Sequence, residues 1–199
     1  MNNASEDIII DSVMTNGEIF MQNPQNIAPQ NVLDSLSVLI VRYYGFDDKL
    51  HQGQMVMHKN LAREVQTFFE HARAIKFPIE KVIPISNVKY KWDEDISCPD
   101  NNSSGYNYRL VMGTHRISKH AGGFAFDINP AQNIYVRYDE NLNEIFRSPK
   151  GTIYDETVPG TLTSNHSLVV LMKNLGWVWG GDWTPESGRV DYQHFEKTI

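Results

Sequence analysis

The residues that most constrain the fold are polar and lie in two short segments far apart in the chain. The first segment runs from Ser118 to Asp127 and contains His120. The second contains Asp191 and His194, close to the C-terminus. A fold that uses these side chains together must place the end of the chain beside its middle.

His120, Asp127 and His194 form a donor set typical of a catalytic metal centre. Catalytic zinc takes three protein ligands from His and Asp or Glu and leaves a fourth position for water. On one regular strand His120 and Asp127 would point to opposite faces, because they are seven residues apart. Gly122 and Gly123 allow a bend that turns His120 towards the face that presents Asp127. Since two imidazoles and one carboxylate suit zinc best, we expect one Zn²⁺ per chain.

Asp191 and Arg109 are the candidate catalytic residues. Asp191 precedes His194 by three residues, so a strand-like segment must bend locally to bring both to one side. A carboxylate near a water held by zinc can accept its proton, although Asp191 could instead orient a ligand imidazole. Attack on a carbonyl creates negative charge, and Arg109, with Arg116 behind it, is the candidate positive partner. Arg109 could also be a structural ion-pair partner, and Ser118 either a substrate contact or a turn residue.

Two sequence motifs carry a resemblance to a known family. The pattern S-x-H-x-x-G-x-A-x-D is filled by Ser118, His120, Gly123, Ala125 and Asp127, and a later acid-x-x-His element by Asp191 and His194. This combination resembles the zinc peptidases that include D-alanyl-D-alanine carboxypeptidases and phage L-alanyl-D-glutamate endopeptidases. Their fold is shared with lysostaphin-type enzymes and the hedgehog signalling domain. The resemblance extends from about Leu36 to Glu196.

The resemblance implies a function and a role for each site residue. It implies metal ligation by His120, Asp127 and His194, a general base at Asp191, and substrate contacts by Arg109 and Ser118. The implied reaction is hydrolysis of peptide bonds in peptidoglycan stem peptides, next to a D-amino acid. Some relatives carry Glu as the base, so their substrate preference does not transfer to this chain with its shorter Asp. The alternative is a zinc-stabilised binding module without catalysis, and both end-trimming and internal cleavage fit the sequence.

The periodicity of apolar residues predicts an α+β fold. We expect an irregular N-terminal arm over residues 1–33 and a peptidase domain over 34–199. A strand is predicted over 36–44, and helices over 60–76 and 164–176. These elements predict a small antiparallel sheet that carries the metal site, flanked by two principal helices.

Composition excludes several other functions. Lys and Arg total 18 against 24 Asp and Glu, a net charge of -6, so we expect no nucleic-acid partner. No stretch approaches the roughly 20 apolar residues of a membrane-spanning helix. Cys98 is the only cysteine, which excludes an intrachain disulfide and a thiolate metal cage. The wall-peptide substrate implies a site outside the cytoplasm, in the periplasm or cell wall, although the start of the sequence shows no secretory signal.

Overall fold

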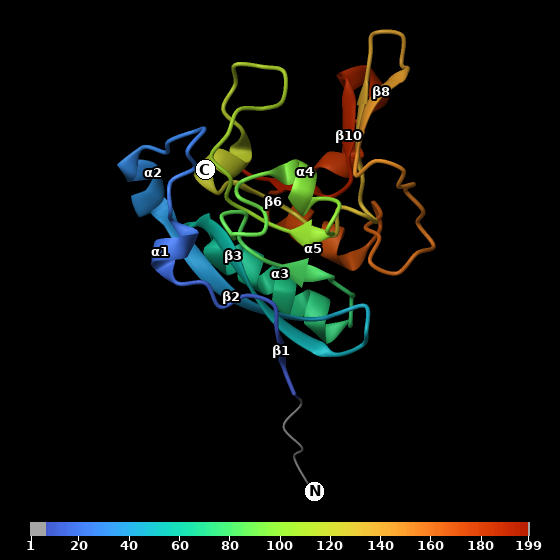
Figure 1. The fold of residues 1–199 in the computed structure, drawn as a ribbon. Helices are drawn as coiled ribbons and strands as arrows, with labels where there is room; N and C mark the ends of the chain where they lie inside the picture. Colours follow the sequence, from blue (N-terminus) through green and yellow to red (C-terminus); the bar gives the residue numbers. More distant parts are fainter. Residues whose placement is uncertain (1–6, 199) are drawn as a thin grey trace, which may run out of the picture.

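In the computed structural model, which describes residues 7–198, the longest strands form an antiparallel hairpin (Figure 1). Strand β2 (Leu36–Tyr44) pairs with β3 (Leu50–His58) along its whole length. Asp48, in the turn between them, has a φ of 59°, a left-handed conformation that Asp tolerates better than most residues. Strand β1 (Ile9–Ile10) adds to β3 in parallel. The range of β2 is the range that the sequence predicts.

Helix α3 (Ala62–Ala74) packs against β2 and supplies a large part of the core. Its buried side chains recur at helical spacing: Val65, Phe68, Phe69 and Ala72. The helix ends before Phe77 and Pro78, because the residue that precedes a proline avoids the helical region. The predicted helix therefore exists and ends close to the predicted place.

Helix α5 (Ser167–Asn174) packs beside α3 and is the second principal helix. It begins at Ser167, later than the predicted start at residue 164. The reason is a side-chain cap, since Nδ1 of His166 accepts a hydrogen bond of 3.3 Å from the backbone N–H of Leu168. Gly176, with a φ of 85°, follows the helix as the predicted stop.

A small antiparallel sheet joins the middle of the chain to its end. Strand β11 (His194–Glu196) lies between β6 (Ala125–Asp127) and β9 (Val178–Trp179). Phe126 and Phe195 are opposite each other on this sheet, fully buried, with their rings stacked 5.1 Å apart. These two rings pack into the main core, so the sheet is anchored on that side.

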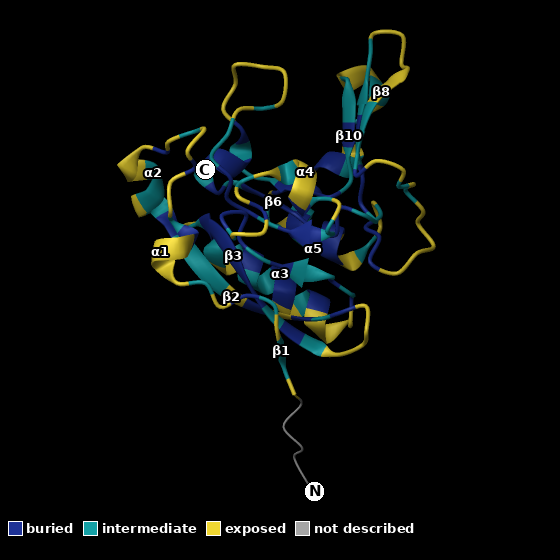
Figure 2. Cartoon of the chain, viewed as in Figure 1, coloured by how far each residue is buried: buried dark blue, intermediate teal, exposed yellow. Residues whose placement is uncertain are grey.

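A second antiparallel sheet stands away from the body of the molecule (Figure 1). Strand β7 (Tyr135–Tyr138) lies at its centre, between β8 (Glu144–Ser148) and β10 (Arg189–Asp191). The turn between β7 and β8 is exposed at the far end of this sheet (Figure 2). None of these three strands is predicted from the sequence.

The described part of the predicted N-terminal arm contains β1 and two short helices, α1 (Asn16–Ile19) and α2 (Gln30–Ser35). Gln54 of β3 fixes the arm to the hairpin, because its Oε1 accepts hydrogen bonds from the hydroxyl of Ser12 at 2.6 Å and the backbone N–H of Met14 at 2.7 Å. The first six residues of the arm lie outside the described residues. A domain boundary near residue 34 stays a prediction.

The remaining elements are short and connect the two small sheets to the hairpin. They are β4 (Lys81–Val82), α4 (Glu94–Ser97), β5 (Asn102–Ser103) and the 3-10 turns η1 (Lys119–Gly122), η2 (Gly180–Asp182) and η3 (Pro185–Ser187). The fold is α+β, as predicted, with several small sheets where the sequence predicts one. Within residues 7–198, no helix has the length and apolar character needed to cross a membrane.

Candidate functional site

Strand register brings Asp127 and His194 together. The two residues are directly opposite each other on β6 and β11, and opposite residues of an antiparallel pair project to the same face. Nδ1 of His194 lies 3.0 Å from Oδ1 of Asp127. Because side chains alternate along a strand, the neighbouring Phe126 and Phe195 point into the core while these two polar groups point away from it.

His120 reaches the same place from the 3-10 turn η1. The hydroxyl of Ser118 accepts a hydrogen bond of 3.3 Å from the backbone N–H of His120 and caps this turn. Gly123 ends the turn with a φ of 68°, and a Cβ at this position would lie 2.5 Å from the backbone nitrogen of His58. Only glycine fits here without strain. The predicted bend therefore depends on Gly123, and it follows a helical turn.

The three side chains are close enough together to hold one metal ion, because one ligand atom from each lies within 4.8 Å of the others. Nε2 of His120 lies 3.2 Å from Nδ1 of His194 and 3.3 Å from Oδ2 of Asp127. A tetrahedral ion with bonds of about 2.0–2.1 Å separates its ligand atoms by about 3.3–3.4 Å. All three side chains are buried, with exposed fractions of 3% for His120, 9% for Asp127 and 7% for His194. This donor set can hold a metal ion.

Each imidazole is oriented through its second ring nitrogen. Nδ1 of His120 donates to the backbone carbonyl of Gly105 at 2.7 Å. Nε2 of His194 lies 3.1 Å from Oε2 of Glu196, which is on the same face of β11 two residues later. Such outer contacts fix the tautomer of a metal-binding histidine and leave its other nitrogen free for the ion.

Without a metal, the site favours a positive imidazole beside a negative carboxylate. Burial disfavours a charged His194, but the carboxylates of Asp127 and Glu196 outweigh it and raise the pKa of His194 to about 10. Burial likewise favours a protonated Asp127, yet the imidazoles of His120 and His194 hold its pKa below the usual range. A divalent cation would take the place of this proton.

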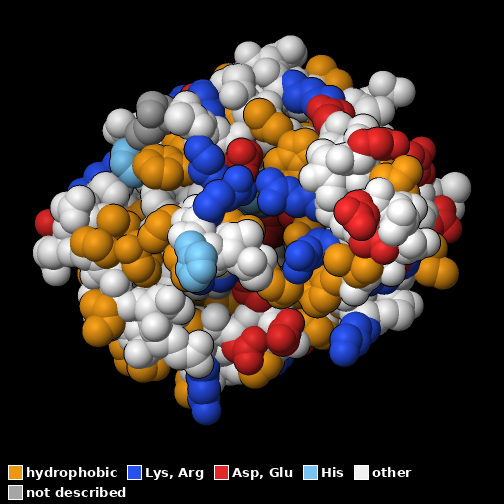
Figure 3. Space-filling view, turned by 90° about the horizontal axis from the view of Figure 1, so that it is seen from above, with side chains coloured by type: hydrophobic (Ala, Val, Ile, Leu, Met, Phe, Trp, Pro, Cys, Tyr) orange, Lys and Arg blue, Asp and Glu red, His pale blue; other side chains and the backbone are white. Residues whose placement is uncertain are grey.

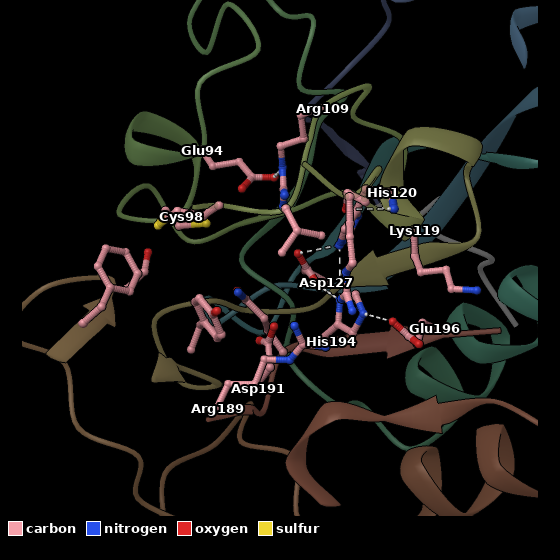
Figure 4. Close-up of a pocket in the computed structure, with 18 of the residues that line it drawn as sticks. Glu94, Cys98, Arg109, Lys119, His120, Asp127, Arg189, Asp191, His194 and Glu196 are labelled. Carbon is pink, nitrogen blue, oxygen red and sulfur yellow. Dashed lines mark hydrogen bonds and ion pairs between the residues drawn. The ribbon is translucent and has the colours of Figure 1, made fainter. Parts of the chain in front are cut away.

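Asp191 lies on the wall of the same cavity, at the end of β10 (Figure 4). The chain changes sheets between Asp191 and His194, which is the local bend that their spacing predicts. Oδ1 of Asp191 is buried and accepts no hydrogen bond from residues 7–198. Burial, together with the charge of Asp127, raises the pKa of Asp191 to about 7, against the opposing effect of His194. This carboxyl can change protonation state near neutral pH.

The other predicted residues also line the cavity but differ in how they are held. Nε of Arg109 donates to Oε1 of Glu94 at 2.6 Å, so Arg109 is an ion-pair partner as well as a wall residue. Arg116 is exposed on the loop between Leu110 and Ile117. Ser118 is buried and acts as the cap of η1.

The cavity has a volume of about 570 Å³ and opens on the face seen in Figure 3. Lys and Arg side chains gather around this opening, while the chain as a whole carries a net charge of -6. The cations that line the cavity are Arg109, Arg116, Lys119 and Arg189. Five carboxylates also line the cavity, those of Glu94, Asp95, Asp127, Asp191 and Glu196, so its lining carries charges of both signs.

Sequence reasoning gives no role to two residues of this site, Glu94 and Arg189. Glu196 is a candidate support for the site from the sequence, and in the structure it is the partner of His194. The i, i+2 spacing of Glu196 after His194 is a signal of that role, because such residues share a strand face. Glu94 carries no comparable signal, since it lies on the short helix α4, outside both motifs.

One comparison with known proteins gives a match. Residues 112–197 match the family model described as D-alanyl-D-alanine carboxypeptidase. The matched segment contains His120, Asp127, Asp191 and His194, and it leaves out Arg109. The match confirms the resemblance that the sequence motifs indicate, and it suggests a peptidase. Comparison with curated proteins and with solved structures gives no match.

Proposed function

We propose that this chain is a zinc peptidase that hydrolyses peptide bonds in peptidoglycan stem peptides, in the manner of D-alanyl-D-alanine carboxypeptidases. One observation carries the proposal: one ligand atom from each of His120, Asp127 and His194 lies within 4.8 Å of the others, at a cavity and within the segment that matches this family. The wall-peptide substrate supports action outside the cytoplasm.

His120, Asp127 and His194 would hold the ion through Nε2, a carboxylate oxygen and Nδ1. When bound, zinc supplies a Lewis acid that lowers the pKa of a coordinated water from about 15.7 to about 7. Glu196 and the carbonyl of Gly105 keep the two imidazoles in the orientation that presents these nitrogens. The protein's contribution is a preorganised and largely buried donor set.

Asp191 is proposed as the general base. Its carboxylate accepts the proton of the attacking water and can pass it to the leaving amine. Oδ1 has no hydrogen-bond partner in the described part of the chain, which supports this role, since an oxygen without a partner is free to receive a proton. A pKa raised to about 7 also suits a group that must accept and release a proton near neutral pH. A purely orienting role is less well supported, because Glu196 and not Asp191 contacts His194.

Arg109 is proposed to stabilise the negative charge that develops on the carbonyl oxygen. Its Nε is held by Glu94 and its Nη1 by the carbonyl of Leu110 at 3.2 Å, while Nη2 has no hydrogen-bond partner within residues 7–198. Glu94 fixes the guanidinium in place at the cavity wall, and a fixed donor costs no reorganisation during the reaction. Ser118 and Arg116 are proposed as substrate contacts at the cavity and its opening.

Incubation of the zinc-loaded protein with purified muropeptides and with peptides ending in D-Ala-D-Ala, followed by mass spectrometry, tests the proposal. Loss of one terminal alanine would identify a carboxypeptidase, and an internal fragment an endopeptidase. Zinc binding without cleavage of either substrate would instead favour the alternative of a zinc-stabilised binding module.

A further inference from the structure

A pair of arginines lies on the sheet that forms one wall of the cavity. Arg189 of β10 is directly opposite Arg137 of β7, and Asp191 is directly opposite Tyr135 two residues further along. Because side chains alternate along a strand, all four residues share one face of this sheet. Asp191, Tyr135 and Arg189 line the cavity, so Arg137 projects to the cavity side as well.

The third strand extends the same face. Ser148 and Phe146 of β8 are opposite Tyr135 and Arg137, and both line the cavity. The wall thus consists of two rows: an inner row that contains Asp191 and an outer row that contains the two arginines. Two residues of a strand span about 7 Å, which sets the distance between the rows.

Within residues 7–198, neither arginine of the pair forms an ion pair with a carboxylate. Arg109 and Arg147 each form an ion pair with a glutamate, whereas no ion pair or hydrogen bond joins the guanidinium of Arg137 or Arg189 to a carboxylate within residues 7–198. Like charges directly opposite each other in a sheet are destabilising. A chain of net charge -6 nevertheless keeps two arginines opposite each other beside the carboxylate of Asp191. An anionic ligand would remove this cost.

The guanidinium of Arg189 is held against an aromatic ring, and that of Arg137 has open space beside it. The guanidinium of Arg189 lies 4.3 Å from the ring centroid of Trp183, a cation–π contact that limits its motion. Both terminal nitrogens of Arg137 lie 3.9 Å from the position of a Cβ on Gly113, in the loop that faces the sheet across the opening. The absence of a side chain at Gly113 leaves space beside this guanidinium.

We propose that Arg137 and Arg189 bind a carboxylate of the substrate within one or two residues of the scissile bond. The inference rests on the proposed function and narrows its substrate to peptides with a free carboxylate at this distance. Guanidinium groups bind carboxylates through two parallel hydrogen bonds, which fixes the orientation of the bound peptide as well as its position. In a stem peptide this carboxylate is either the C-terminal one or the α-carboxylate of the γ-linked D-glutamate.

Three synthetic substrates separate these two sources. They are the pentapeptide L-Ala-γ-D-Glu-L-Lys-D-Ala-D-Ala, its C-terminal amide, and its analogue with D-isoglutamine in place of D-glutamate. Each is assayed for kcat and KM with the zinc-loaded wild type, Arg189→Gln and Arg137→Gln. Arg147→Gln is the matched control, because Arg147 lies on the opposite face of the same sheet and outside the cavity.

We expect Arg189→Gln and Arg137→Gln each to raise KM for the parent peptide by about ten- to a hundred-fold. This is the usual loss in affinity when a hydrogen bond to a charged group is removed. The Arg147→Gln variant should leave KM unchanged. Arg189→Lys should recover only part of the affinity, because lysine keeps the charge and loses the planar fork. If the bound group is the C-terminal carboxylate, wild type should have a higher KM for the amide than for the parent peptide, and the Gln variants should not. If it is the α-carboxylate of D-glutamate, wild type should instead have a higher KM for the isoglutamine peptide, and the Gln variants should not.

Equal KM values for all three peptides in wild type and in both Gln variants would overturn the inference while leaving the peptidase intact. Failure of the proposed function gives a different result, namely no cleavage of any peptide by wild type. In that case the arginine pair is tested by binding affinity alone. The same peptides are titrated by calorimetry into Asp191→Asn and into Asp191→Asn combined with Arg137→Gln or Arg189→Gln. Each added Gln substitution should weaken the affinity by about ten- to a hundred-fold.

Discussion

His194 and Asp127 face each other across the pair of strands β11 and β6, with Nδ1 of the imidazole 3.0 Å from Oδ1 of the carboxylate. Two of the three donor groups are therefore fixed by backbone register, with Phe126 and Phe195 locked in the core on the reverse face. The third, His120, depends on a capped 3-10 turn and one glycine. This division decides how each substitution should act.

Asp191→Asn should keep the metal and lose most turnover. The amide is nearly isosteric with the carboxylate but cannot accept the proton, and loss of a general base costs about a hundred- to ten-thousand-fold in kcat. Zinc content and kcat on a D-Ala-D-Ala peptide check this. Asp182→Asn is the control, since Asp182 is exposed, pairs with Lys173 and lies outside the cavity. Full activity in Asp191→Asn would show that another residue is the general base.

Glu196→Gln should weaken metal binding more than it lowers kcat at saturating zinc. The amide is a poorer acceptor for the Nε2–H of His194, and loss of such an outer contact typically costs about ten- to a hundred-fold in metal affinity. Competition with a zinc chelator measures the affinity. Glu186→Gln, at a fully exposed position, should have no effect. Unchanged affinity in Glu196→Gln would mean that His194 is oriented by other contacts.

Zinc binding should release a proton near neutral pH. Asp127 and Glu196 raise the pKa of His194 to about 10 against the effect of burial, so the metal-free imidazole is positively charged at pH 7. Coordination requires the neutral ring, so the proton must leave and the apparent affinity must rise with pH, by about tenfold per unit between pH 6 and 8. Calorimetric titration in two buffers of different ionisation enthalpy measures the proton. Identical heats in both buffers would show that His194 is already neutral.

Gly123→Ala should destabilise the fold and the metal site together. The left-handed backbone costs a non-glycine residue about 1–2 kcal/mol, and the contact of 2.5 Å with the backbone nitrogen of His58 adds about 1–3 kcal/mol of overpacking. Gly151→Ala is a matched control, because Gly151 has a φ of 77° and a Cβ added there would meet no atom within 4 Å. Urea unfolding should show the smaller loss there. Equal losses at both positions would mean that the turn can shift without cost.

Much of the site could be predicted from the sequence because its chemistry is local. The ligand set follows from residue types and spacing, and the bend before His194 follows from the mismatch between a three-residue spacing and a two-residue strand period. Helix α3 and strand β2 have long, regular apolar patterns and lie where the sequence places them.

The rest depends on contacts between segments far apart in the chain. Strands β7, β8 and β10 are short and have exposed positions, so their apolar pattern is weak and their pairing cannot be read locally. The arginine pair and the ion pair of Arg109 with Glu94 exist only through this tertiary arrangement. These contacts, and not the motifs, give the cavity its basic opening.

The zinc content of purified His120→Ala tests the central claim most directly. The account predicts one zinc per chain in wild type and in the control His115→Ala, whose side chain is exposed on the loop before η1. It predicts a loss of zinc and of peptidase activity in His120→Ala, measured by elemental mass spectrometry and cleavage assay on the same samples. One zinc per chain retained in His120→Ala would contradict the assignment of the metal site.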